Sequence, residues 1–195
     1  MQILKRVLLS FIFVSSTVIL FGQSEIEWMI NKAIRLTEYK EERELAPVID
    51  QLSVSFGQQN FPENENISQK KINDQLANIK TLITNSVGSN ISFKEIGDAL
   101  YKIKYELALV KLRTIEKYND EEFHQSQSSI ISNIESLAAS AAALEINNDA
   151  ETGYLQALNY FNGVKIGMLK NKKLKKGRNI LSDVIRTASS SSITR

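Results

Sequence analysis

Apolar residues recur every three or four positions along most of this chain, and few stretches alternate with a period of two. The clearest example runs from Phe93 to Val110, where six apolar residues follow this spacing and would form one face of a helix. Pro47 and Pro62 are the only prolines. The pattern predicts an all-α protein: an up-and-down bundle of four to five helices with a long central antiparallel helical hairpin.

The N-terminal half is expected to form helices on both sides of one clear loop. Pro47 cannot donate a backbone hydrogen bond, so we expect it either to kink the first helix or to open a new one. Gly57 suits a C-terminal cap, and the polar segment 57–66 is typical of a loop. The spacing of apolar residues between Ile72 and Ile83 predicts the next helix.

Two long helices are expected in the middle of the chain. The first contains the apolar seam from Phe93 to Val110. The second begins at Asn119 or Asp120, since either side chain can cap a helix, and its seam ends at Leu144. The connection between them is short, which favours a hairpin of two antiparallel helices, each on the order of 40 Å long.

The C-terminal part is predicted to hold one more long helix and a short last one. Asp149 is expected to cap a helix whose apolar seam reaches Met168. Gly177 is expected to end this helix or an adjoining turn, and a short helix then holds residues 180–185. The Ser-rich segment 188–195 is predicted to be disordered.

The most apolar stretch of the chain lies at its beginning and is typical of a secretory signal peptide. Lys5 and Arg6 precede an uncharged run of 15 residues, Val7–Phe21, which is shorter than the roughly 20 residues that a membrane-spanning helix needs. Gly22 is a small residue suited to cleavage. The alternative is an uncleaved N-terminal anchor. The ending Phe21–Gln23 resembles signal peptides of Bacteroidetes-type bacteria, which often leave Gln as the first mature residue.

The expected organisation is therefore a signal peptide over 1–22, a single helical-bundle domain over 23–187 and a disordered tail over 188–195. The protein is expected to be exported by a bacterium, either to the periplasm or out of the cell. The chain has no Cys, which removes disulfides, thiolate metal sites, cysteine nucleophiles and a lipoprotein anchor from consideration. Stability must come from packing.

The net charge of the chain gives no support to nucleic acid as a partner. Residues 1–22 contain two basic residues and no acid, so the remaining chain balances 22 basic against 22 acidic residues. A net charge near zero gives no reason to expect nucleic-acid binding. A membrane partner is expected only if the apolar N-terminal run is not cleaved.

One segment near the C-terminus is strongly basic. It contains no acid, and its cations include the residues that we take as a possible interaction patch: Lys170, Lys172, Lys173, Lys175, Lys176 and Arg178. Such a run could bind an anionic partner such as an acidic protein or lipid headgroups. The plainer interpretation is a solvated helix C-terminus, where the helix dipole favours cations.

Other candidate features are weaker. Gly163 and Gly167 could let neighbouring helices approach closely within the chain; the alternatives are a dimer contact or a thin-walled ligand groove. Aromatic residues on the three central helices could line a cleft, although core packing explains them: Tyr101, Tyr105, Tyr118, Tyr154, Tyr160 and Phe161. His124 beside the acids of 120–122 is a poor metal site, because structural and catalytic sites need three or four convergent ligands.

The sequence lacks the motifs of metal, phosphate and nucleophile chemistry, including H-E-x-x-H and a Gly-rich phosphate loop. We therefore expect no cofactor, no metal and no catalytic residue. The expected function is non-catalytic protein–protein interaction in the envelope, with a partner that is another envelope or secreted protein or a second copy of the chain. Two alternatives stay open: a small-molecule or lipid-binding module with a groove between long helices, and an envelope enzyme that uses converging carboxylates.

Overall fold

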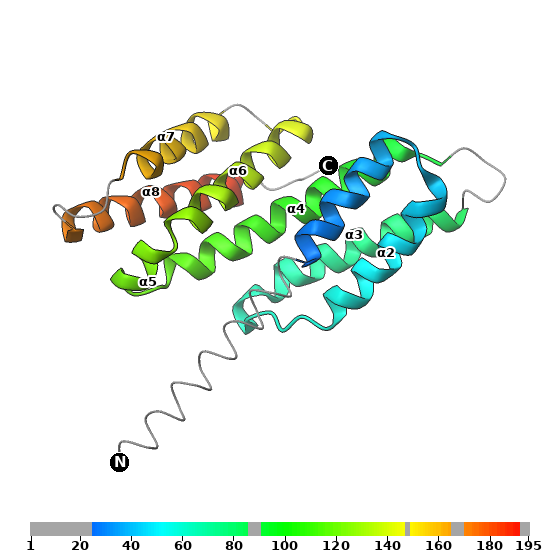
Figure 1. The fold of residues 1–195 in the computed structure, drawn as a ribbon, viewed down its shortest axis with the longest axis horizontal. Helices are drawn as coiled ribbons and strands as arrows, with labels where there is room; N and C mark the ends of the chain where they lie inside the picture. Colours follow the sequence, from blue (N-terminus) through cyan, green and yellow to red (C-terminus); the bar gives the residue numbers. More distant parts are fainter. Residues whose placement is uncertain (1–24, 86–90, 147–148, 165–169, 192–195) are drawn as a thin grey trace, which may run out of the picture. The chain divides into compact units, whose positions relative to one another are not determined.

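The computed structural model describes residues 25–85, 91–146, 149–164 and 170–191. Within these ranges every regular element is a helix, and the helices pack in the manner of a bundle (Figure 1), so the predicted all-α class is confirmed. None of the helices in the described ranges is both long and apolar enough to cross a membrane. The predicted signal peptide, Val7–Phe21 included, lies outside the described residues and stays a prediction.

The chain forms two compact units. The first comprises residues up to Pro62 and Leu76–Leu100, and the second comprises Glu63–Gln75 and the chain from Tyr101 onwards. Helices α3 (Asn66–Asn85) and α4 (Phe93–Glu116) each contribute residues to both units. The expectation of a single domain over 23–187 stays a prediction.

The first unit contains a helix over residues 25–38, α2 (Glu42–Gly57) and parts of α3 and α4. The first two helices separate at Lys40, which has a φ of 56°. The amide of Lys40 bonds the Thr37 carbonyl and the amide of Glu41 bonds the Leu36 carbonyl at 2.9 Å, the pattern of a Schellman cap. Pro47 lies inside α2, so the alternative that Pro47 opens a new helix was wrong: the break comes at Lys40.

The second unit contains 3₁₀-helix η1 (Glu63–Glu65), the N-terminal part of α3, the C-terminal part of α4, and the four remaining helices. These are α5 (Asp120–Gln125), α6 (Gln127–Ala143), α7 (Asp149–Gly163) and α8 (Lys170–Ser190). One continuous apolar core joins α4 to α8 and includes Tyr105, Leu112, Ile134, Phe161 and Leu181. In Figure 1, α6, α7 and α8 gather beside the second half of α4.

The central hairpin is less regular than predicted. Helix α4 has 24 residues and is about 36 Å long. Asn119 caps α5 and forms a capping box with Glu122, which confirms the predicted start of the second arm. That arm is interrupted at Ser126, however, and continues as α6.

The C-terminal helices also differ from expectation. Helix α7 ends at Gly163, and the segment that was predicted to carry it to Met168 lies partly outside the described residues. Gly177 does not end a helix, as was predicted, because it lies inside the 21-residue helix α8. Helix α8 continues to Ser190, and Ala188 is buried in the core, so the predicted disorder is wrong for residues 188–190.

Candidate functional site

The basic run lies at the opposite end of a helix from the one expected. It occupies the first turns of α8, whose first turn holds no acid and whose last turn holds no base. The positive end of the helix dipole lies at an N-terminus, so it opposes these cations rather than favouring them. The explanation of the run as a solvated helix C-terminus is therefore wrong.

The face of α8 that packs against the core determines which of its cationic side chains are exposed. Leu174, Gly177 and Leu181 are buried, at a spacing that places them on one face of the helix. Lys172, Lys175 and Lys176 are exposed and Lys173 is half-buried. None of the ion pairs that the described part of the chain shows involves these four lysines. The side chain of Lys170 lies outside the description.

Arg178 does not belong to a free patch. Its Nη2 lies 3.0 Å from Oδ1 of Asp120 and donates to the carbonyl of Tyr118. Its guanidinium lies 5.2 Å from the centre of the Phe123 ring. These contacts fasten α8 to the start of α5 and give Arg178 a packing role, and the interaction role expected of it stays a prediction.

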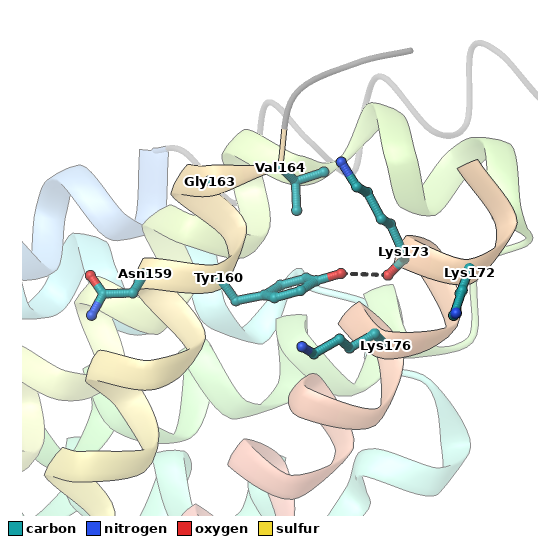
Figure 2. A pocket seen from close by; sticks show the side chains of 7 residues that line it. All are labelled: Asn159, Tyr160, Gly163, Val164, Lys172, Lys173 and Lys176. Atoms are coloured by element: carbon teal, nitrogen blue, oxygen red, sulfur yellow. Dashed lines mark hydrogen bonds between the residues drawn. The ribbon is translucent and has the colours of Figure 1, made fainter. Parts of the chain in front are cut away.

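An open pocket of about 490 Å³ lies between the end of α7 and the start of α8 (Figure 2). Its lining comes from both helices and from the residue that follows α7: Asn159, Tyr160, Gly163, Val164, Lys172, Lys173 and Lys176. Most of the exposed lining surface is apolar. The pocket thus brings three of the predicted patch lysines together with residues that the predicted patch did not include.

Tyr160 is the central side chain of the pocket. Its hydroxyl donates a 2.6 Å hydrogen bond to the carbonyl of Lys173, which ties α7 to α8. Nζ of Lys176 lies 5.6 Å from the centre of the same ring, within the range of a cation–π contact. Burial raises the pKa of the Tyr160 phenol above its ordinary value, so the ring is neutral at physiological pH.

The ring of Tyr160 packs against other aromatic rings of the second unit. It meets Phe161 edge-on with 5.4 Å between centroids, and Phe161 lies 6.3 Å from Phe123. A Cβ at Gly177 would lie 3.2 Å from Phe161 and 3.4 Å from Tyr160. Only a glycine at position 177 lets α8 approach these rings without displacing them.

The carbonyls at the end of α7 also have a partner. Nε2 of Gln127 donates to the carbonyls of Phe161 and Val164. The last carbonyls of a helix have no partner within the helix, so this contact satisfies them and fixes the backbone beside the pocket. Gly163 has no atom within 4 Å of its Cβ position, so it does not serve the close helix packing that was expected of it; it opens the pocket instead.

The other candidate features lie elsewhere. Tyr105, Tyr154 and Phe161 pack in the core of the second unit. His124 is half-buried on α5, and within the described ranges no group of three or more His, Cys, Asp or Glu residues could hold a metal ion. Gly167 lies outside the description.

Sequence reasoning missed a buried polar network that joins η1 and α3 to α4. Arg113 donates three hydrogen bonds to the carboxylate of Glu65, the shortest at 2.7 Å, and one to the hydroxyl of Ser68. Ser68 donates to Glu106, which also pairs with Lys71 at 2.8 Å. Each of the two buried acids is thus matched by a cation, as burial of a charge requires.

The pocket can attract an anion and offer it an apolar and aromatic wall. The side chains that line it carry no carboxylate. No protein-family model matches the chain, and neither a curated protein nor a solved structure shows significant similarity to it.

Proposed function

We propose that this chain is a non-catalytic binding protein of the bacterial envelope or of the secreted fraction, and that it recognises an acidic surface on a partner protein through the basic start of α8. The partner is another envelope or secreted protein or a second copy of the chain. The interaction surface consists of Lys172, Lys173, Lys175 and Lys176.

The observation that carries this proposal is the position of these lysines. They lie in the first two turns of α8, and the positive end of the helix dipole is unfavourable to the cations of the first turn, Lys172 and Lys173. No ion pair among the described residues compensates them. An acidic partner would supply the missing compensation and would be attracted over long range by the same field.

The compartment is supported by the N-terminal sequence. Lys5 and Arg6 followed by Val7–Phe21 have the order and length of a signal peptide. A chain without Cys folds in an oxidising compartment without any risk of wrong disulfides. An intact mass that lacks residues 1–22, measured on protein from a fraction outside the cytoplasm, would test this part.

The non-catalytic part is supported by the state of the buried acids. Glu65 and Glu106 are the described carboxylates with the least exposed side chains, and each is engaged by a cation. An enzyme that relied on converging carboxylates would need such groups free and facing a pocket. Neither lines the pocket between α7 and α8.

The test compares two changes of equal charge. Lys172→Glu with Lys175→Glu should reduce binding to the acidic partner and flatten its dependence on salt, because the attraction is electrostatic. Lys117→Glu with Lys70→Glu changes the charge equally at exposed lysines outside the α8 run and should leave binding unchanged. Binding is measured as quantitative co-purification from an envelope extract, and self-association by sedimentation of the purified chain, at low and high salt. Equal effects of the two double variants would refute the proposal.

A further inference from the structure

The pocket between α7 and α8 has the dimensions of a small-molecule site. Its volume of about 490 Å³ falls within the roughly 300–1,000 Å³ that ligand pockets occupy. Such pockets combine a mostly apolar wall with a few polar groups that fix orientation, and this pocket has both.

The positive charge of the pocket lining favours an anionic ligand. Lys172, Lys173 and Lys176 contribute three ammonium groups, and none of the side chains around the pocket is acidic. In Figure 2, the side chains of Lys173 and Lys176 lie on different sides of Tyr160, whereas that of Lys172 points away from it. An anionic group near Lys173, on the same side of the ring as Val164 in Figure 2, would meet a cation that has no carboxylate partner among the described residues, and Lys176 would add to the positive field.

The aromatic and apolar part of the lining favours a ligand whose uncharged part is apolar. The Tyr160 hydroxyl is already engaged with the Lys173 carbonyl, so the residue offers its ring rather than a hydrogen bond. Val164 adds an apolar side chain above that ring in Figure 2. A flat apolar body would bury carbon surface against both, which an inorganic anion could not do.

We propose that this pocket binds a small organic carboxylate with a flat, apolar body, held by Lys173 at its charged end and by Tyr160 and Val164 along its body, in the positive field to which Lys176 contributes. The pocket shares Lys172, Lys173 and Lys176 with the surface proposed above for a macromolecular partner, but it takes a different ligand, and neither proposal depends on the other. Lys175 lies beside Lys176 in the sequence but is not part of the lining, which makes it the natural control.

The test uses 2-naphthoate as ligand and its neutral amide, 2-naphthamide, as the matched compound. Titration is followed by calorimetry and by amide chemical shifts of the full mature chain. Naphthoate should bind and shift the signals of Tyr160, Val164, Lys173 and Lys176, and the amide should bind at least about tenfold more weakly because it lacks the charge. Absence of naphthoate binding, or equal binding of both compounds, would overturn the proposal.

Variants locate the site. Lys173→Gln with Lys176→Gln should weaken naphthoate at least about tenfold, whereas Lys175→Gln should leave it unchanged. Val164→Trp should block binding while keeping every charge, and its far-ultraviolet circular dichroism should match that of the wild type. Equal losses in the double variant and in Lys175→Gln would mean a diffuse charge effect and would refute the pocket.

The two proposals fail separately. If Val164→Trp abolishes naphthoate binding but leaves partner co-purification intact, both proposals stand, and the small ligand and the partner use the shared lysines independently. If Lys172→Glu with Lys175→Glu leaves co-purification unchanged while naphthoate still binds, the macromolecular proposal fails and the pocket proposal stands.

Discussion

The hydroxyl of Tyr105 on α4 donates a 2.8 Å hydrogen bond to the carbonyl of Ala188, close to the end of α8. Both residues are buried, with 1% of their surface exposed. The last four carbonyls of a helix lack partners within the helix, so this bond satisfies a buried acceptor that would otherwise be orphaned. The contact explains why α8 stays ordered beyond the point where the sequence turns Ser-rich.

Removing this hydrogen bond should be costly. Tyr105→Phe keeps the ring but leaves the Ala188 carbonyl without its partner, and we expect the free energy of unfolding to fall by about 1–3 kcal/mol. Tyr154→Phe is the matched control, because its hydroxyl makes only a 3.4 Å contact with that of Tyr105. Urea denaturation should show the smaller loss for Tyr154→Phe; the reverse order would contradict the assigned role of Tyr105.

Stability should fall at alkaline pH through the same pair of tyrosines. Burial raises the pKa of both Tyr105 and Tyr154 above the ordinary phenol value, and their mutual contact raises that of Tyr105 further. A group whose pKa is raised by folding stabilises the protein fully below its unfolded pKa, which is about 10 for tyrosine, and loses that contribution as the pH rises. Each tyrosine should contribute up to about 1.4 kcal/mol per pH unit above pH 10.

The measurement is urea denaturation repeated from neutral pH to above pH 10, with phenolate absorbance as a second signal. The double variant Tyr105→Phe with Tyr154→Phe should show a shallower alkaline decline than the wild type. If the decline were equally steep in the double variant, the alkaline sensitivity would have to come from other groups.

Two glycines on neighbouring helices should respond differently to alanine. Alanine normally stabilises a helix interior by about 1 kcal/mol relative to glycine. Gly153 on α7 has no atom within 4 Å of its Cβ position, so Gly153→Ala should realise most of that gain. At Gly177 the new Cβ would meet Phe161 at 3.2 Å, so Gly177→Ala should gain nothing or destabilise.

Thermal unfolding of both alanine variants tests this contrast. Gly177→Val should destabilise clearly, since a branched side chain cannot fit beneath the rings of Phe123, Tyr160 and Phe161. A Gly177→Ala variant as stabilised as Gly153→Ala would show that α8 does not rest closely on these rings.

Breaking the buried ion pair between Glu65 and Arg113 should lower the free energy of unfolding more than breaking a surface pair. The side chain of Glu65 is 4% exposed, and Arg113 contacts both of its carboxylate oxygens. Glu65→Ala leaves Arg113 partly buried and unpaired, so we expect a loss of about 3 kcal/mol. The surface pair of Lys70 and Asp74 is the control: Asp74→Ala should cost less than about 0.5 kcal/mol.

A double-mutant cycle completes this comparison. Arg113→Met combined with Glu65→Ala should recover part of the loss, because no charge is then left buried without a partner. Additive losses in the double variant would show that the two side chains act independently.

Much of the secondary structure was predictable because helical periodicity is a local property. The seam from Phe93 to Val110 predicted α4, and the capping preference of Asn119 predicted the start of α5. The segment over residues 170–178 was recognised as the most basic part of the chain from composition alone. These features depend on residues that are close together in the sequence.

Helix boundaries without a strong local signal were predicted less well. Gly177 appeared to end a helix, because glycine costs about 1 kcal/mol in a helix interior. The structure keeps it there because three aromatic rings lie against its missing side chain, and those rings come from α5 and α7. The break at Lys40 was missed for a related reason: a non-glycine residue takes a left-handed conformation that its sequence does not announce.

The sequence by itself determined that this protein is helical, that its apolar residues form continuous seams, and where its cations concentrate. Only the tertiary structure decided that these cations lie at a helix N-terminus, that Arg178 is engaged by Asp120, and that three lysines share a pocket with Tyr160. The physical reason is that periodicity and composition act within a few residues, whereas ion pairing and pocket formation depend on side chains that only folding brings together.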